Sequence, residues 1–435
     1  MRSVISISLL PLAVILFLQG CSAHVTQKAR GSIKHPPAVE SGLMQGVPPA
    51  PDRRVTFDNW MTPPYNRWGF LHVSTIVPTA SIYRGNQSLM PLTRWTKNIN
   101  LITFDDPDGS LMSVGQMLEK TYTDGFIVLK DGKIITEHYF NGLTPNTRHI
   151  IWTCSQAIIG SLVGIYVKRG KVDLNSRVTD HIPELAESGF GDATLQQLLD
   201  MQVGLDYSER YDSASVPNVS QLWRAAGYKP AQSPDEYSIY DYLRTIGKVG
   251  THGALFQYAT PNTEVLGWIL ERVNGKPLVD QLSESIWAQL GTERDAYSVV
   301  NRLGSASPGG GFCVTLRDFA RFGQMHLLKG RFNNRDIVPS TWIEGIQSGG
   351  SRSAFQQSEM AQIFPRGSFR NQWWVTGSDD GSYLAMGIYG QFLYISPKSN
   401  VVIAKMSSYP EPVHPELTVI TLGAFKAISD RLKSL

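Results

Sequence analysis

The sequence is poor in cysteine and in regularly spaced metal ligands. Three cysteines occur in 435 residues, at positions 21, 154 and 313. No C-x-x-C and no His-x-x-x-His spacing is present, so we predict no metal site, and we expect no cofactor. Cys154 and Cys313 could pair in an oxidising compartment, but two buried free thiols are the preferred interpretation.

The chain also lacks an excess of charge of either sign. It has 40 basic and 37 acidic residues, a formal net charge of +3. Because no basic patch of the kind that nucleic acid requires is present, we do not expect nucleic acid as a partner. With 42% hydrophobic and 18% charged residues, the composition is that of a globular chain with one large or two small cores.

A long apolar run stands at the N-terminus, from Val4 to Leu18, after the cationic Arg2. It is short for a membrane span, which needs about 20 apolar residues, and is typical of a secretory signal. The sequence LQGC that ends at Cys21 resembles a bacterial lipobox, in which residues 1–20 are removed and the cysteine is lipidated. We therefore expect a lipid-anchored protein of the bacterial cell envelope that faces the periplasm. Ser22, in place of an aspartate, favours the outer membrane over the inner. An uncleaved anchor or an ordinary signal peptide is the alternative.

Two further segments divide the rest of the chain. Residues 21–55 are rich in proline, glycine and charge without apolar periodicity, and we interpret them as a flexible tether. Residues 56–435 form the folded domain.

A buried helix is predicted for residues 148–170. Its apolar residues spread over most of the circumference, which is typical of a helix inside a core. Thr153, Gln156, Ala157 and two glycines share one face at helical spacing. Because that face is small or polar, another element or a ligand can approach its backbone closely.

Strands are predicted on both sides of a helical region. Residues 125–140 form a hairpin with Asp131-Gly132 as its tight turn, and 371–375, 383–397 and 400–409 are strand-like. The segment from about 172 to 343 is helical and loop-rich, and 415–435 form a terminal helix. We predict an α+β fold in which both groups of strands join one antiparallel sheet.

The helix at 148–170 resembles the nucleophile helix of the serine β-lactamase and penicillin-binding-protein superfamily. The closest resemblance is to its class C β-lactamase-like esterase and aminohexanoate-oligomer-hydrolase-like branch. The motif there is Ser-x-x-Lys-Ser, then a small-residue step, then Leu-Val-Gly. Aligning Leu162-Val163-Gly164 puts Thr153 at the serine, Gln156 at the lysine and Ala157 at the second serine. The resemblance implies an antiparallel sheet flanked by helices, with the helical region as an inserted lobe.

The same resemblance implies further site residues. Tyr258 matches the family's proton-shuttling tyrosine, and Asn262 matches the asparagine that positions the substrate or a side chain. Tyr211 falls where the aminohexanoate-hydrolase-like branch places a tyrosine that touches substrate. The family's third motif, Lys-Thr-Gly or His-x-Gly, is matched at 388–391 by Ile-Tyr-Gly-Gln, so Gly390 and Gln391 are binding candidates without the family's cation. We expect its backbone N–H to act as an oxyanion donor together with the N–H of Thr153.

The altered residues predict weak or absent catalysis. A hydroxyl is a poor nucleophile without an adjacent base, and a positioned base contributes roughly 10²–10⁴-fold. Gln156 neither accepts a proton nor carries a charge, and the methyl group of Thr153 stiffens χ1 and crowds the approach. The expected ligand is a small amide, ester or cell-wall-derived molecule.

Three hypotheses remain open at this point. The first is a rewired hydrolase with Thr153 or Ser155 as nucleophile and Tyr258 as base. The second is a non-catalytic lipoprotein that uses the retained pocket to bind a cell-wall or acyl ligand. The third, the least favoured, takes Cys154 as the nucleophile.

Overall fold

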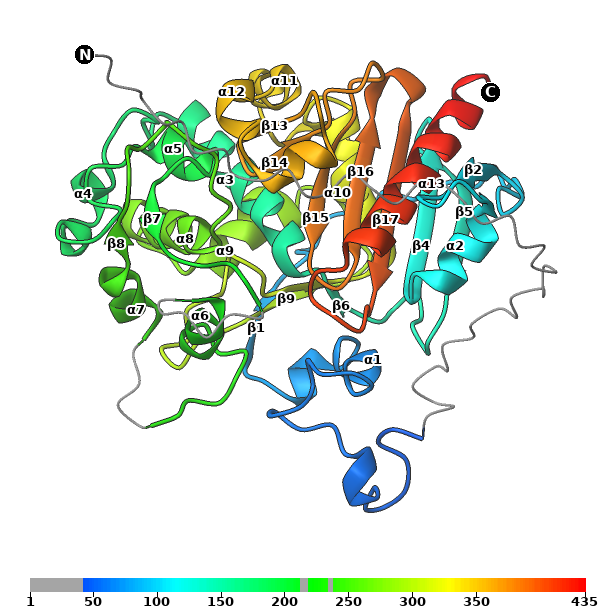
Figure 1. Ribbon diagram of the computed structural model, residues 1–435, viewed down its shortest axis with the longest axis horizontal. Coiled ribbons are helices and arrows are strands. Elements are labelled where there is room, and N and C mark those ends of the chain that lie inside the picture. The colour runs from blue at the N-terminus through cyan, green and yellow to red at the C-terminus, as the bar shows by residue number, and fades with distance from the viewer. Residues whose placement is uncertain (1–41, 212–217, 234–237) are drawn as a thin grey trace, which may run out of the picture.

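One large antiparallel sheet organises the molecule (Figure 1). The computed structural model describes residues 42–435 except 212–217 and 234–237. The seven strands follow the order β13-β14-β15-β16-β17-β4-β5. Their bounds are Ser368–Arg370, Trp373–Val375, Tyr383–Gly387, Gln391–Ser396, Val401–Ser407, Thr123–Lys130 and Lys133–Tyr139. The hairpin and the C-terminal strands therefore share one sheet, as the sequence predicted.

The β4–β5 hairpin forms through its predicted turn. Asp131 and Gly132 both have positive φ angles, 50° and 74°, which a two-residue type I′ turn requires. All eight residues of β4 are buried because helices cover both faces of the sheet. On one face, α13 (Pro415–Lys433) places the Phe425 ring 6.4 Å from that of Phe126 and 5.7 Å from that of Phe392.

The other face is covered by α10 (Leu316–Leu327). Gly323 lets this helix approach closely, since a Cβ there would lie 2.7 Å from Val402 Cγ1 and 2.8 Å from Leu393 Cδ1. We expected α10 to belong to the inserted lobe, which we placed at about 172–343. It packs on the main sheet instead, so the lobe ends before it.

The central helix α3 (Ser155–Lys168) is buried over twelve consecutive residues, Ser155 to Tyr166. It begins later than predicted, because β6 (His149–Ile150) pairs with β10 and a 3-10 turn, Trp152–Cys154, precedes the helix. The small face of α3 allows the close backbone approach that the sequence predicted. A Cβ on Gly160 would lie 2.3 Å from the Asn371 carbonyl oxygen, so only glycine permits this approach.

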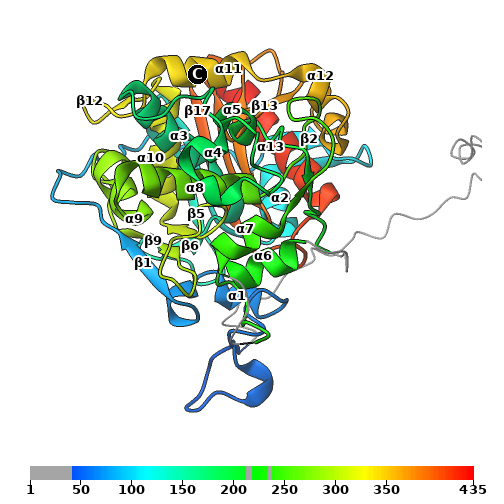
Figure 2. The same ribbon diagram turned by 90° about the vertical axis from the view of Figure 1, so that its left-hand side faces the viewer.

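In its described residues, the lobe contains six α-helices that lie on one side of the main sheet (Figures 1 and 2). They are α4 Val178–His181, α5 Leu195–Leu199, α6 Val219–Ala225, α7 Ile239–Thr245, α8 Pro261–Asn274 and α9 Leu278–Leu282. A second sheet, which we did not predict from the sequence, has the order β1-β9-β10-β6. It includes β1 Thr79–Ile82, β9 Ala296–Val299 and β10 Phe312–Val314.

Short elements complete the described chain. They are α1 Asn66–Gly69, α2 Val114–Lys120, α11 Ser340–Ser348, α12 Arg352–Phe355, β2 Thr103–Asp105, β3 Leu111–Ser113, β7 Leu205–Asp206, β8 Gly247–Lys248, β11 Arg331–Phe332 and β12 Arg335–Asp336. Within residues 42–435, gaps excepted, the structure contains no helix with the length and apolar character of a membrane span.

A buried ionic network ties β4 to the segment that leads into α3. The Asp124 carboxylate lies 3.0 Å from Arg67 Nη1 and 3.1 Å from His149 Nε2, and it accepts a hydrogen bond of 2.7 Å from Ser408 Oγ. The Asp124 and His149 side chains have no exposed surface. Arg67 lies on α1, His149 on β6 and Ser408 directly after β17. The network therefore fixes the position of β6, and with it the position at which the chain enters α3.

Candidate active site

Thr153 lies in the 3-10 turn at the start of α3, against the end of strand β15. Its hydroxyl donates a hydrogen bond of 3.0 Å to the Met386 carbonyl oxygen. A Cβ on Gly387 would lie 2.6 Å from the Ile151 carbonyl oxygen and 3.2 Å from Thr153 N. The glycine therefore lets the strand backbone run directly beside the predicted nucleophile.

Gln156 and Tyr258 meet beside Thr153. The Tyr258 hydroxyl donates to Gln156 Oε1 at 3.1 Å, and Gln156 Nε2 donates to the Gly309 carbonyl oxygen at 3.4 Å. The Thr153 side chain lies close enough to the Tyr258 phenol to lower its pKa. Residues 102 positions apart in the chain, Gln156 and Tyr258, are thus in direct contact. The structure brings together the three residues that the resemblance places at nucleophile, lysine and tyrosine.

The Tyr258 phenol is held in its protonated form. Burial and the nearby Glu209 carboxylate raise its pKa well above the usual range, and the polar side chains of Thr153 and Gln156 beside it offset only part of this. The ring stacks on Trp374 with centroids 5.5 Å apart and an interplanar angle of 22°. The hydroxyl therefore acts as a fixed donor near neutral pH and is poorly suited to accept a proton.

A small cavity adjoins Thr153. The cavity volume, measured as the space open to the centre of a water-sized sphere, is about 20 Å³. This is enough for about one water molecule. Its lining consists of Trp152, Thr153, Glu209, Tyr211, Leu222, Trp223, Tyr228, Thr260, Glu264, Gly309, Gly310 and Ile388. Tyr211 is therefore at the site, as the resemblance implied. None of these lining residues is a lysine, arginine or histidine.

Two carboxyl groups in this lining were not predicted as site residues. Glu209 accepts hydrogen bonds from Thr260 N at 2.9 Å, Thr260 Oγ1 at 2.7 Å and the Tyr211 hydroxyl at 3.2 Å. Burial raises its pKa, and the bonds from Thr260 lower it in part. The one sequence signal for Glu209 is its position two residues before Tyr211, in the same loop.

Glu264 is the second carboxyl group, in the first turn of α8. It accepts from Ser307 Oγ and from Gly309 N, both at 3.0 Å. Burial raises its pKa from the ordinary value near 4.5 to about 7, against the opposing effect of these two bonds. Gly309 therefore links this carboxyl to the amide of Gln156.

We expect the raised pKa of Glu264 to make the free energy of unfolding depend on pH. Because its folded-state pKa is raised, the stabilisation is full below about pH 4.5 and is lost as the pH rises through about 7, a change of ~3 kcal/mol. Urea unfolding of the wild type and of Glu264→Gln across this range should show the smaller decline for the variant. Parallel pH dependences for the two proteins would contradict a raised pKa at this residue.

Three predicted binding residues lie away from the cavity. Asn262 is fully buried, and its Nδ2 contacts Met201 Sδ at 3.2 Å. The run 383–397 is a hairpin and not one strand, because Tyr389 and Gly390 have positive φ angles of 59° and 84°. Gly390 therefore faces the Tyr409 ring, where a Cβ would lie 2.2 Å from Cε1.

Gln391 begins strand β16 with its side chain bound to the backbone. Its Nε2 donates to the Ser407 carbonyl oxygen at 2.6 Å, and its Oε1 accepts from Ser407 N at 3.2 Å. The part of the matched motif that reaches the cavity is Ile388, with Gly387 beside it. We therefore move the expected oxyanion donor from Gly390 and Gln391 to the backbone of 387–388.

The two alternative nucleophiles are placed in the core. Ser155 Oγ accepts from Phe312 N at 3.2 Å and is fully buried. Burial raises the pKa of the Cys154 thiol, which contacts the Gln391 carbonyl oxygen at 3.6 Å. Cys154 and Cys313 are both buried and free, as preferred from the sequence.

Comparison with known proteins identifies the family. The Beta-lactamase family model matches residues 116–425. A 6-aminohexanoate-dimer hydrolase from Paenarthrobacter ureafaciens is 36% identical over 385 residues, which cover 88% of this chain and 94% of the relative. This chain therefore belongs to the β-lactamase family.

Solved structures agree with this assignment. A Bacillus anthracis protein assigned as a 6-aminohexanoate-dimer hydrolase has a TM-score of 0.81 at 29% identity, over 89% of this chain and 99% of that one. A penicillin-binding protein homologue from Caulobacter crescentus has a TM-score of 0.53 at 14% identity, over 72% and 96% of the two chains, a likeness of fold alone. The fold and the superfamily expected from the sequence are confirmed.

Proposed function

We propose that this protein is a cell-envelope lipoprotein whose β-lactamase-related domain binds a small amide or ester beside Thr153 with little hydrolytic turnover. The observation that carries the proposal is the hydrogen bond from Tyr258 to Gln156 Oε1 at 3.1 Å. In this arrangement the phenol donates to a neutral amide at the position of the family's lysine. Neither the Gln156 amide nor the neutral Tyr258 phenol is then poised to accept the Thr153 proton.

The missing base has a defined kinetic consequence. A hydroxyl attacks a carbonyl efficiently only when an adjacent base takes its proton. The Thr153 hydroxyl donates to the Met386 carbonyl, which cannot take up a proton, and the raised pKa of Tyr258 keeps its phenol neutral. The loss of a positioned base corresponds to roughly 10²–10⁴-fold in rate.

The arrangement still supports binding of a carbonyl group. The backbone of Gly387 lies beside Thr153 N, and Ile388 lines the cavity. Two backbone N–H groups at such a place polarise a carbonyl oxygen without any proton transfer. An amide or ester carbonyl is thus the group that we propose to lie against Thr153.

The charge of the cavity narrows the ligand class. Two glutamates and four aromatic residues line it, and no lining residue is cationic. An ammonium nitrogen is close to water in size, is attracted by aromatic faces, and favours the ionised form of the two glutamates whose pKa values burial raises. We therefore extend the proposal to amides or esters that carry an ammonium group, a chemistry also present in the name of the 36% identical relative.

Acylation of the wild type tests the proposed lack of turnover. Incubation with a fluorophosphonate or a penicillin, followed by intact-mass measurement, is expected to leave the mass of the wild type unchanged. The Thr153→Ser, Gln156→Lys double variant serves as the matched positive control, because it restores both parts of the family motif. A stoichiometric adduct on wild-type Thr153 would overturn the proposal.

A second candidate function is hydrolysis of an amide by a rewired site. It is favoured by the hydrolase relative at 36% identity and by the contact of Thr153, Gln156 and Tyr258. Fast wild-type turnover that is abolished by both Thr153→Val and Tyr258→Phe would establish it. A binding protein would show the same slow background rate in all three forms.

The lipid anchor at Cys21 is a separate part of the proposal, and the LQGC sequence supports it. The wild type is expected to fractionate with membranes and to carry an acylated N-terminal cysteine. Cys21→Ala should abolish acylation and move the protein out of the membrane fraction, while Cys154→Ala serves as the control. An unmodified, soluble wild type would contradict the anchor.

A further inference from the structure

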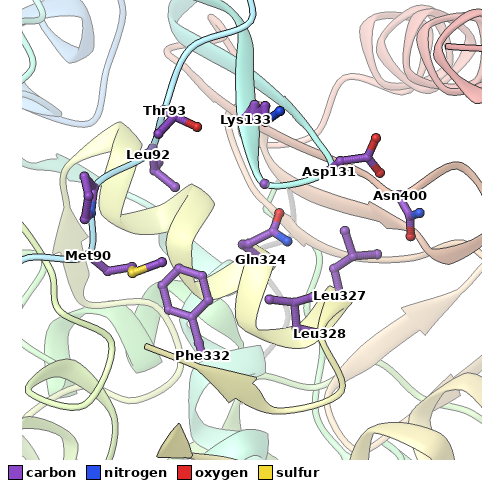
Figure 3. A pocket seen from close by; sticks show the side chains of 12 residues that line it. Met90, Leu92, Thr93, Asp131, Lys133, Gln324, Leu327, Leu328, Phe332 and Asn400 are labelled. Carbon is purple, nitrogen blue, oxygen red and sulfur yellow. The ribbon is translucent and has the colours of Figure 1, made fainter. Parts of the chain in front are cut away.

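A larger hollow lies at the edge of the main sheet, and it shares no lining residue with the Thr153 cavity (Figure 3). It is bounded by residues 90–93, the β4–β5 turn, the end of α10 and Asn400. A water-sized sphere has about 460 Å³ to move in there, within the range of about 300–1,000 Å³ for small-molecule pockets. Much of its lining is apolar, formed by Met90, Leu92, Leu327, Leu328 and Phe332.

The walls of this groove are held in place by backbone hydrogen bonds. Met90 N donates to Gly291 O at 3.0 Å, and its carbonyl oxygen accepts from Arg321 Nε at 3.0 Å. Ile134 N donates to Thr93 O at 2.8 Å, which joins residues 90–93 to the edge strand β5. The groove is therefore formed before any ligand arrives, and binding does not require its walls to order.

Gln324 is the polar group at the centre of the groove. Figure 3 shows its side chain projecting from α10 into the space between the hairpin and residues 90–93. The residue is only 3% exposed, and within the described parts of the chain its Oε1 has no hydrogen-bond partner. A buried amide oxygen without a partner is uncommon, because its lost hydration is not compensated.

The rim charges favour a neutral ligand. Asp131 and Lys133 stand on the same turn with opposite signs, and the Asp131 carboxylate is already 3.2 Å from Lys130 Nζ. Asp131 would repel a negatively charged ligand, and Lys133 would repel a positively charged one. Electrostatic complementarity therefore selects a polar, uncharged head group for the position next to Gln324.

We propose that this groove is a second binding site, which takes an aliphatic molecule carrying a primary carboxamide. The ligand N–H donates to Gln324 Oε1, and Gln324 Nε2 donates to the ligand carbonyl oxygen. An amide is the group that offers one donor and one acceptor side by side, as this pairing needs. The aliphatic chain lies against Leu327, Leu328 and Phe332. The site does not depend on the function proposed for Thr153.

Methionine methyl NMR reports the two sites separately. Met90 lines the groove, whereas Met386 is the residue whose carbonyl binds Thr153. With methyl-13C methionine in the full domain, assigned through Met90→Leu and Met386→Leu, hexanamide is expected to shift the Met90 signal saturably. A dissociation constant on the order of 1 mM is expected for a ligand of this size.

Variants test the role of Gln324. Gln324→Leu keeps the volume without the amide and should weaken hexanamide binding at least ~10-fold. Gln357→Leu, at an exposed glutamine outside the groove, is the matched control and should bind as the wild type does. Leu328→Asp changes a residue that is 49% exposed, so it tests the apolar lining of the groove without disturbing the core. It should also weaken binding.

Three outcomes would overturn this inference. The first is the lack of a saturable Met90 shift up to ~10 mM hexanamide. The second is a shift of Met386 in place of Met90, which would assign binding to the Thr153 site. The third is hexanoate or hexylammonium binding as well as hexanamide, which would remove the argument for a neutral amide.

Discussion

Thr153→Ser combined with Gln156→Lys is expected to raise ester hydrolysis by about 10²–10⁴-fold over the wild type. The lysine would supply a base and a cation next to the Tyr258 hydroxyl, which now lies 3.1 Å from Gln156 Oε1. The serine would present the same hydroxyl without the methyl group. Each single change should do little, because nucleophile and base act as a unit.

Hydrolysis of a nitrophenyl ester measures this effect. The control is Thr153→Ser with Gln156→Met, which changes the same two positions without adding an amine. Near-ultraviolet circular dichroism should show that all forms keep the wild-type packing, since Gln156 is only 2% exposed. Additive effects of the two single changes, or a double variant no faster than the control, would mean that position 156 does not hold the base.

Asp124→Ala should lower the free energy of unfolding by about 3–5 kcal/mol. The substitution leaves Arg67 and His149 without their shared carboxylate, at sites where the exposed fractions of their side chains are 10% and 0%. A buried charge without a partner retains the full penalty of its lost hydration. Because the network adjoins the start of α3, the variant should also reduce the local order around Thr153.

Urea unfolding at constant pH measures the loss. The matched control is Asp430→Ala, which removes a carboxylate from an exposed pair with Lys426 on α13. Exposed pairs of this kind contribute about 0–1 kcal/mol. A loss below ~1 kcal/mol for Asp124→Ala would show that water or a rearranged partner replaces the carboxylate.

Much of the candidate site was accessible from the sequence. Thr153 and Gln156 follow from helical spacing and from the register of Leu162-Val163-Gly164, and Tyr258 follows from the resemblance. These residues are predictable because the family motif has a fixed spacing along the chain, so one aligned segment assigns the positions before it. The structure then places Tyr258 in contact with both.

The errors lie where local pattern is ambiguous. The apolar run 383–397 predicts strand on both sides of residues 388–390, and a tyrosine is an uncommon residue for the positive φ of 59° that Tyr389 adopts in the turn. The reversal moves Gly390 and Gln391 from the site to the far side of the hairpin. It leaves Gly387 and Ile388 next to Thr153.

The sequence by itself determined the buried helix with a small face, the Asp131-Gly132 hairpin, the C-terminal strands and the replaced motif residues. The helix, the hairpin and the strands rest on periodicity and turn chemistry, which act over a few residues, and the replaced motif residues rest on the resemblance to the family. The tertiary structure alone decided that Glu209 and Glu264 share a cavity with Thr153, and that Gln324 is left without a partner in a separate groove. The reason is physical. Whether a carboxyl or an amide is buried, and what it contacts, depends on the packing of segments far apart in the chain, which no local pattern encodes.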